Sequence, residues 1–113
     1  MLEASNVVKL TPLDQWISKG RCGGVHKVRR VFDRPIKISY KKYLGKKYDL
    51  AFKMNNGKFY CSELVWVIYK EQFNTELCKP KKISKYNIGL FKKQIKKRGI
   101  DINACAVAPC DLL

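Results

Sequence analysis

The sequence predicts a domain of the α+β class, on three observations. The chain has 113 residues, which suits one modest hydrophobic core. Hydrophobic residues make up 46% of it and charged residues 29%, the balance of a globular protein. Strand-like and helix-like segments follow one another without the regular βαβ order of a parallel sheet. Because no internal repeat or Gly/Ser-rich linker is visible, we take residues 1–113 as a single domain.

The N-terminal part of the chain predicts two strands separated by a helix. Residues 7–10 form a short strand. The helix then begins with Thr11 as N-cap and Pro12 at the first helical position, and it ends at a glycine-rich turn over residues 20–24. The next segment, 25–32, is β-branched and interrupted by basic residues, which is typical of a strand with one face in water.

The rest of the chain predicts a hairpin and several short elements. Residues 36–44 suggest a short basic helix after a proline. Residues 48–60 suggest a β-hairpin, because the pair Asn56-Gly57 accepts the positive φ of a tight turn. The remaining predicted elements are a helix over residues 61–73, a strongly basic helix over 87–98 that stops at Gly99, and a last strand over 104–108.

The net charge of +15 favours anionic partners, such as a membrane surface, an anionic polymer or nucleic acid. In the basic helix, lysines at 92, 93, 96 and 97 also fit a solvated helix face, and both interpretations stay open. Nucleic acid is the weaker partner, because tyrosines between the lysines are joined by no RNP-type or helix-turn-helix signature.

The cysteines and the start of the chain exclude several classes. Five cysteines with no CxxC pair, and His26 as the only histidine, predict no disulfide framework and no metal, and nothing in the sequence predicts a cofactor. No apolar run approaches the roughly 18 residues that span a bilayer. The first ten residues do not resemble a secretory signal, so the chain as written predicts a cytosolic protein.

Cys61 is the candidate nucleophile. It stands at the start of the predicted helix 61–73, where free backbone N–H groups and the helix dipole favour a thiolate. Its spacing to Leu64, Val65 and Ile68 places it on the apolar face of that helix. The alternative is an inert thiol in the core, which is the commoner fate of a free cysteine.

Two segments resemble a known family. They read KKYLGKKYDLAF (41–52) and FYCSELVWVIYKE (59–71). They resemble the circularly permuted, papain-like hydrolases of the NlpC superfamily, in the YiiX/YebB group. The N-terminal segment and the ending AVAPCDLL (106–113) are also similar to that family, in the same order, so the resemblance covers almost the whole chain.

The resemblance implies a papain-like fold in which a small antiparallel sheet packs on the helix of the nucleophile. Cys61 matches the nucleophile, and Glu3 matches the residue that orients a catalytic histidine. Tyr48, Asp49 and Tyr60 become candidate substrate-binding residues, with a turn role for Asp49 left open. The implied reaction is hydrolysis of an amide or ester bond, in peptide-like or lipid-like substrates, through an acyl-enzyme.

The chain departs from the family pattern at the general base. The resemblance places the catalytic histidine on a strand before Glu3, whereas His26 comes after it. We therefore expect a copy without its first strand, or an inactive relative, and the runner-up is a basic protein that binds nucleic acid or another polyanion. Complete relatives often carry an export signal, which leaves the compartment open.

We expect the 113-residue chain alone to have little or no hydrolase activity, because an unassisted thiol is a poor hydrolytic catalyst. An amidase and esterase assay beside a complete relative tests this. Equal rates for the two proteins would contradict it.

Overall fold

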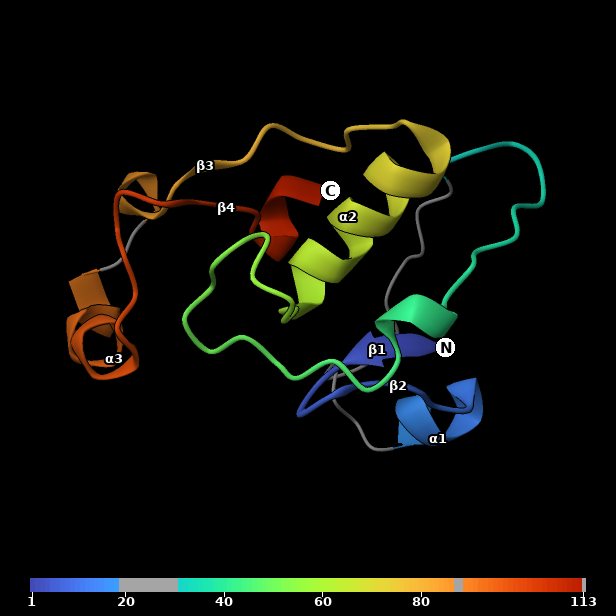
Figure 1. Cartoon of the computed structure of the whole chain (residues 1–113), viewed down its shortest axis with the longest axis horizontal. Coiled ribbons are helices and arrows are strands. Elements are labelled where there is room, and N and C mark those ends of the chain that lie inside the picture. The colour runs from blue at the N-terminus through green and yellow to red at the C-terminus, as the bar shows by residue number, and fades with distance from the viewer. Residues whose placement is uncertain (19–30, 87–88, 113) are drawn as a thin grey trace.

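The computed structural model describes residues 1–18, 31–86 and 89–112. In this part of the chain, one central helix, α2, lies between two small antiparallel sheets (Figure 1). The strands are β1 (Leu2–Ala4), β2 (Val8–Leu10), β3 (Lys81–Lys82) and β4 (Cys105–Ala106), and the α-helices are α1 (Leu13–Ser18), α2 (Cys61–Phe73) and α3 (Lys92–Arg98). Four 3-10 turns accompany them: η1 (Lys41–Tyr43), η2 (Ile83–Lys85), η3 (Gly89–Phe91) and η4 (Pro109–Leu112).

The first sheet packs against one side of α2. β1 and β2 are antiparallel, with Leu2 opposite Leu10 and Ala4 opposite Val8. Val8 is 1% exposed and joins Leu64 and Ile68 of α2 in a core cluster, against which Leu2 and Ala4 also pack. The strand predicted at residues 7–10 is therefore confirmed, and burial of one face fixes its register.

Helix α2 covers the predicted residues 61–73, but its buried face differs from the predicted one. Leu64 and Ile68 are buried as expected, whereas Val65 is 41% exposed and Cys61 is exposed. The polar residues Ser62 and Glu63 are buried instead. The apolar pattern alone was misleading because backbone from the C-terminal segment covers the first turn of the helix and supplies polar partners there.

That cover is a pair of hydrogen bonds to Val107, which is 1% exposed. The Ser62 hydroxyl donates to the Val107 carbonyl at 2.6 Å, and the Val107 N–H donates to the Tyr60 hydroxyl at 2.9 Å. Both backbone groups of a buried residue are therefore satisfied by side chains at the start of α2. Tyr60 also forms a second core cluster with Ile83 and Ala106.

The hairpin predicted over residues 48–60 is wrong. Tyr48 and Phe59 form an isolated bridge that is parallel, and the chain between them is a loop. The physical reason is Asp49, whose carboxylate accepts from the N–H groups of Ala51 at 3.0 Å and Lys53 at 2.8 Å. Because these bonds curl the segment locally, its amides do not build an antiparallel ladder.

The helix predicted over residues 36–44 is also wrong, since only the 3-10 turn η1 forms there. The Gln72 side chain pairs with both backbone groups of Ser39, accepting from its N–H at 2.9 Å and donating to its carbonyl at 2.7 Å. This pairing takes up the Ser39 carbonyl, which a helix over 36–44 would need as the acceptor of the Tyr43 N–H.

The later predicted elements exist in shorter form. The helix predicted over 87–98 begins at Lys92 and ends before Gly99, whose φ of 63° is the left-handed conformation expected after a helix. The last strand keeps only residues 105–106 of the predicted 104–108. The turn predicted at 20–24 and nearly all of the strand predicted at 25–32 lie outside the described residues.

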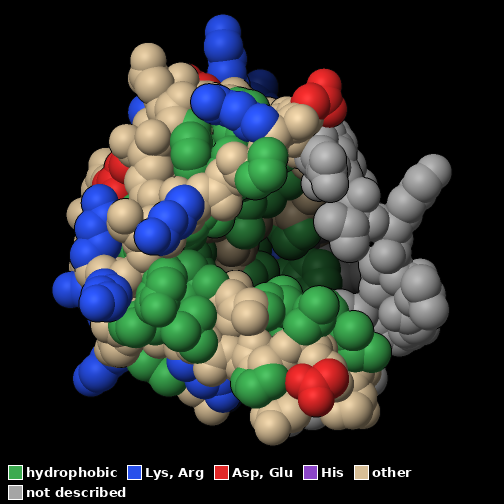
Figure 2. All heavy atoms as spheres, turned by 90° about the vertical axis from the view of Figure 1, so that its right-hand side faces the viewer, with side chains coloured by type: hydrophobic (Ala, Val, Ile, Leu, Met, Phe, Trp, Pro, Cys, Tyr) green, Lys and Arg blue, Asp and Glu red, His purple; other side chains and the backbone are tan. Residues whose placement is uncertain are grey.

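The N-terminal end of the molecule exposes apolar side chains. Leu13 and Ile17 of α1 are 58% and 63% exposed. Figure 2 views the end of the molecule that carries α1 and the N-terminus, and hydrophobic side chains gather there around a hollow. Among the described residues, the helices are too short and too polar to cross a membrane.

We predict that Tyr60→Phe lowers the free energy of unfolding by about 1–3 kcal/mol, because the buried Val107 N–H loses its acceptor. Urea denaturation of the purified chain measures this. Tyr40→Phe is the matched control, since Tyr40 is only half-buried and its hydroxyl has no side-chain cap role at η1. Equal stability of Tyr60→Phe and the wild type would show that the hydrogen bond from the Val107 N–H to the Tyr60 hydroxyl does not stabilise the fold.

Candidate active site

Cys61 is the first residue of α2 and its side chain is exposed. The thiol lines a cavity of about 620 Å³. The 13-residue helix behind it presents its positive end to this cavity. An incoming anion, or a carbonyl oxygen that gains negative charge, would therefore meet favourable electrostatics beside the sulfur.

The walls of this cavity are mostly apolar. They come from the loop before α2, from the C-terminal segment and from α3, and the aromatic rings among them belong to Tyr48, Phe52, Tyr60, Tyr86 and Phe91. Arg98 is the only charged side chain among the described residues that line it. Such walls suit an apolar group of a substrate.

Tyr48 lines the same cavity, and its hydroxyl group interacts with Cys61. Burial raises the pKa of the Tyr48 hydroxyl, and the Cys61 side chain raises it further, whereas the Cys61 N–H and Arg98 lower it by less. The phenol therefore keeps its proton at neutral pH and can act as a donor. The Tyr48 hydroxyl thus lies beside both the thiol and the backbone N–H of Cys61.

Two buried carboxylates, those of Glu63 and Asp49, accept hydrogen bonds from backbone N–H groups at the start of α2 and in the loop before it. Glu63 is 1% exposed, and its Oε2 accepts from the Tyr60 N–H at 3.3 Å, as the N3 residue of a capping box does. Burial raises the pKa of Glu63 from 4.5 to about 7, and the neighbouring Asp49 charge also raises it. This carboxyl group therefore releases its proton at a much higher pH than an exposed glutamate does.

Asp49 serves the loop. It is 3% exposed and accepts from the N–H groups of Ala51 and Lys53 and from the Asn56 side chain at 2.8 Å. These bonds hold the loop that carries Tyr48 and Phe52 into the cavity. Its placement matches the turn role that the sequence left open, and substrate contact by Asp49 stays a prediction.

The predicted site residues are brought together only in part. Tyr48 and Tyr60 line the cavity with Cys61. Glu3 lies on β1, 8% exposed, where Ser5 donates to its Oε1 at 3.3 Å and Lys9 lies 3.8 Å from the same oxygen. It is not among the cavity-lining residues, and its orienting role stays a prediction. His26 lies outside the described residues.

Sequence reasoning missed several cavity residues. Arg98 ends the basic helix that the sequence predicted without any role at the site, and Phe91, which is 57% exposed, also lines the cavity. Tyr86 and Ile100 gave no signal, because they reach the cavity through the pairing of β3 with β4 and not through any local motif.

The fold and this cavity define a protein of the permuted papain-like class. The chain belongs to the family described as "Permuted papain-like amidase enzyme, YaeF/YiiX, C92 family", whose model matches residues 1–108. The resemblance inferred from residues 41–52 and 59–71 is thereby confirmed.

Two relatives from Escherichia coli are similar to the chain. Uncharacterized protein YiiX of strain K12 is 34% identical over 103 residues, which cover 85% of this chain and 50% of that protein. The crystal structure of metalloprotein yiiX from strain O157:H7 has a TM-score of 0.72 at 27% identity, covering 98% of this chain and 68% of that one. The chain thus spans half the length of the curated relative it matches.

The solved relative is described as a metalloprotein. Within residues 1–18, 31–86 and 89–112, no three His, Cys, Asp or Glu side chains are grouped so that they could hold a metal ion. The described residues therefore do not fit a protein metal centre built from three such side chains.

We predict that Glu63→Gln flattens the pH dependence of stability between about pH 5 and pH 8. The pKa of Glu63 is higher in the folded state than its ordinary 4.5, so its contribution to stability is full below about pH 4.5 and is lost as pH rises through about 7. Chemical denaturation of both proteins across this range measures the difference. Parallel curves for the variant and the wild type would refute the assignment.

Proposed function

We propose that the protein is a cysteine hydrolase of amide or ester bonds, with Cys61 as its nucleophile. The observation that carries the proposal is the exposed Cys61 thiol at the first residue of α2, open to an apolar cavity. Family membership supports the class of reaction, since the family is one of papain-like amidases.

The reaction starts when the Cys61 thiolate attacks the carbonyl carbon of the substrate, forming a C–S bond while the carbonyl electron pair moves to oxygen. We assign the Tyr48 hydroxyl, which lies beside the Cys61 thiol, as a donor for that oxyanion. Collapse of the intermediate breaks the bond to the amine or alcohol, which takes a proton from water as it leaves. Water then hydrolyses the thioester, releases the acid and returns the thiol.

The substrate class follows from the walls of the cavity. Cell-wall peptides and lipid esters or amides are the candidates that the resemblance implies. The aromatic rings of Phe52 and Phe91 favour a substrate with an apolar group next to its scissile carbonyl. A water-exposed, fully polar substrate would gain little from these walls.

The general base is the finer part of the proposal. The resemblance assigns it to a histidine upstream of Glu3, with Glu3 as its orienting residue, and His26 is the only histidine of these 113 residues. We infer that acylation of Cys61 by an activated ester proceeds in this chain, whereas deacylation, which needs a base to activate water, is slow.

We predict that octanoyl p-nitrophenyl ester transfers its acyl group to Cys61, which intact-mass spectrometry detects as an adduct of one octanoyl group. Cys61→Ala should form the adduct at least about a hundredfold more slowly, since the nucleophile is gone.

Cys105→Ala is the matched control, because Cys105 is another exposed free thiol that lies outside the cavity lining. The control should react as the wild type does. Equal acylation of Cys61→Ala and wild type, or loss of acylation in the control, would overturn the assignment of Cys61.

A further inference from the structure

A second groove adjoins the Cys61 cavity along α3. It has a volume of about 680 Å³ and is lined by Leu50, Lys93, Gln94, Lys97 and Arg98. Gln94 and Arg98 line the cavity of Cys61 as well, so the two spaces meet at these two side chains.

The two spaces differ in chemical character. The Cys61 cavity is apolar apart from Arg98, whereas three cations and no acidic residue line the groove. Lys93 and Lys97 are one helical turn apart on one face of α3, and Arg98 shares the adjoining face with Gln94, one turn before it. Three like charges around one groove repel one another, and a bound anion relieves that repulsion.

We propose that the groove of Lys93, Lys97 and Arg98 binds the phosphate group of an amphiphilic substrate whose apolar arm occupies the Cys61 cavity. This inference rests on the proposed function, because it places the scissile carbonyl of that substrate near the thiol. Arg98, which lines both spaces, stands at the junction between the apolar arm and the anionic group.

Phosphate fits the groove better than a carboxylate does. A phosphate monoester carries more than one negative charge near pH 7 and three acceptor oxygens, which three cationic donors can share. Lysine is a common point-charge partner of phosphate, and the arginine fork can hold two of its oxygens. A carboxylate, with one charge, would leave the lysines largely uncompensated.

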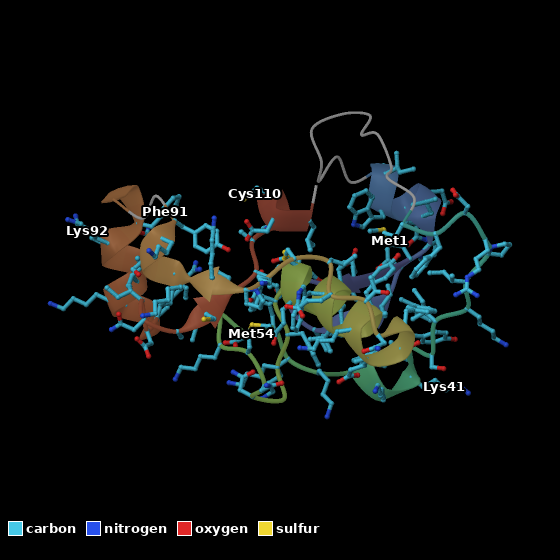
Figure 3. All side chains as sticks on the ribbon, turned by 90° about the horizontal axis from the view of Figure 1, so that it is seen from above. Met1, Lys41, Met54, Phe91, Lys92 and Cys110 are labelled. Carbon is cyan, nitrogen blue, oxygen red and sulfur yellow. The ribbon has the colours of Figure 1, made fainter. Side chains whose placement is uncertain are left out.

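The other lysines of α3 provide an internal control. Lys92 and Lys96 carry the same charge but do not line either space. The Lys92 side chain points away from the body of the molecule (Figure 3). A specific site therefore requires Lys93 and Lys97, whereas general attraction by the helix charge would depend equally on both pairs.

The test measures binding to Cys61→Ala, so that no reaction occurs, by calorimetry with octyl phosphate, octyl glucoside and inorganic phosphate below micelle-forming concentrations. We expect octyl phosphate to bind at least about tenfold more tightly than either of the other two probes. Adding Lys93→Ala and Lys97→Ala should weaken octyl phosphate about tenfold and leave octyl glucoside unchanged, while Lys92→Ala with Lys96→Ala changes either by less than twofold.

Two results would overturn the inference. Equal binding of octyl phosphate and octyl glucoside would show that no anion site exists. Equal weakening by the two double variants would assign the attraction to the charge of the whole helix. Because the measurement does not involve the thiol, its failure leaves acylation of Cys61 untouched, and a failure of acylation leaves this binding result standing.

Discussion

The two hydrogen bonds of Tyr60 and Ser62 to Val107, here called the Val107 clamp, join the start of α2 to the C-terminal segment. Tyr60 and Ser62 flank Cys61 in sequence, and their hydroxyl groups bind the two backbone groups of Val107 from the far end of the chain. Cys61, the residue between them, therefore lies where the start of α2 meets the C-terminal segment, and its thiol stays exposed. Leaving the buried N–H and carbonyl of Val107 without partners would cost free energy, so the position of Cys61 depends on the folding of the C-terminal segment.

Around the Val107 clamp, buried polar side chains hold the backbone in place by hydrogen bonds, and apolar side chains line the cavity of Cys61. Asp49 fixes the loop that supplies Tyr48 and Phe52, and Glu63 binds the N–H of Tyr60. Both carboxylates face away from solvent, and their mutual repulsion contributes to the raised pKa of Glu63. The aromatic residues supplied in this way leave the thiol in surroundings that favour acyl groups.

Local signals in the sequence predicted the parts of the fold that depend on local interactions. The extent of helix α2 was predicted well, because a 3.6-residue apolar repeat is a local feature. The hairpin at 48–60 failed because the Asn-Gly signal was overridden by Asp49, which captures two nearby amides. The helix at 36–44 failed because its competitor, Gln72, lies more than thirty residues away in sequence. Cys61 was found from its position at a helix start, whereas the contribution of Arg98 depends on where α3 folds back and had no local signature.

The placement of α3 has a consequence for substrate entry. This helix forms one wall of the space at Cys61, yet its principal packing partner among the named elements is the adjoining turn η3, and its exposed residues outnumber its half-buried ones. A segment held by so few neighbours opens at a lower free-energy cost than the core does. Movement of α3 would therefore widen the space at Cys61 without disturbing the packing of α2 against the first sheet, and a bulky molecule could enter while the start of α2 stays in place.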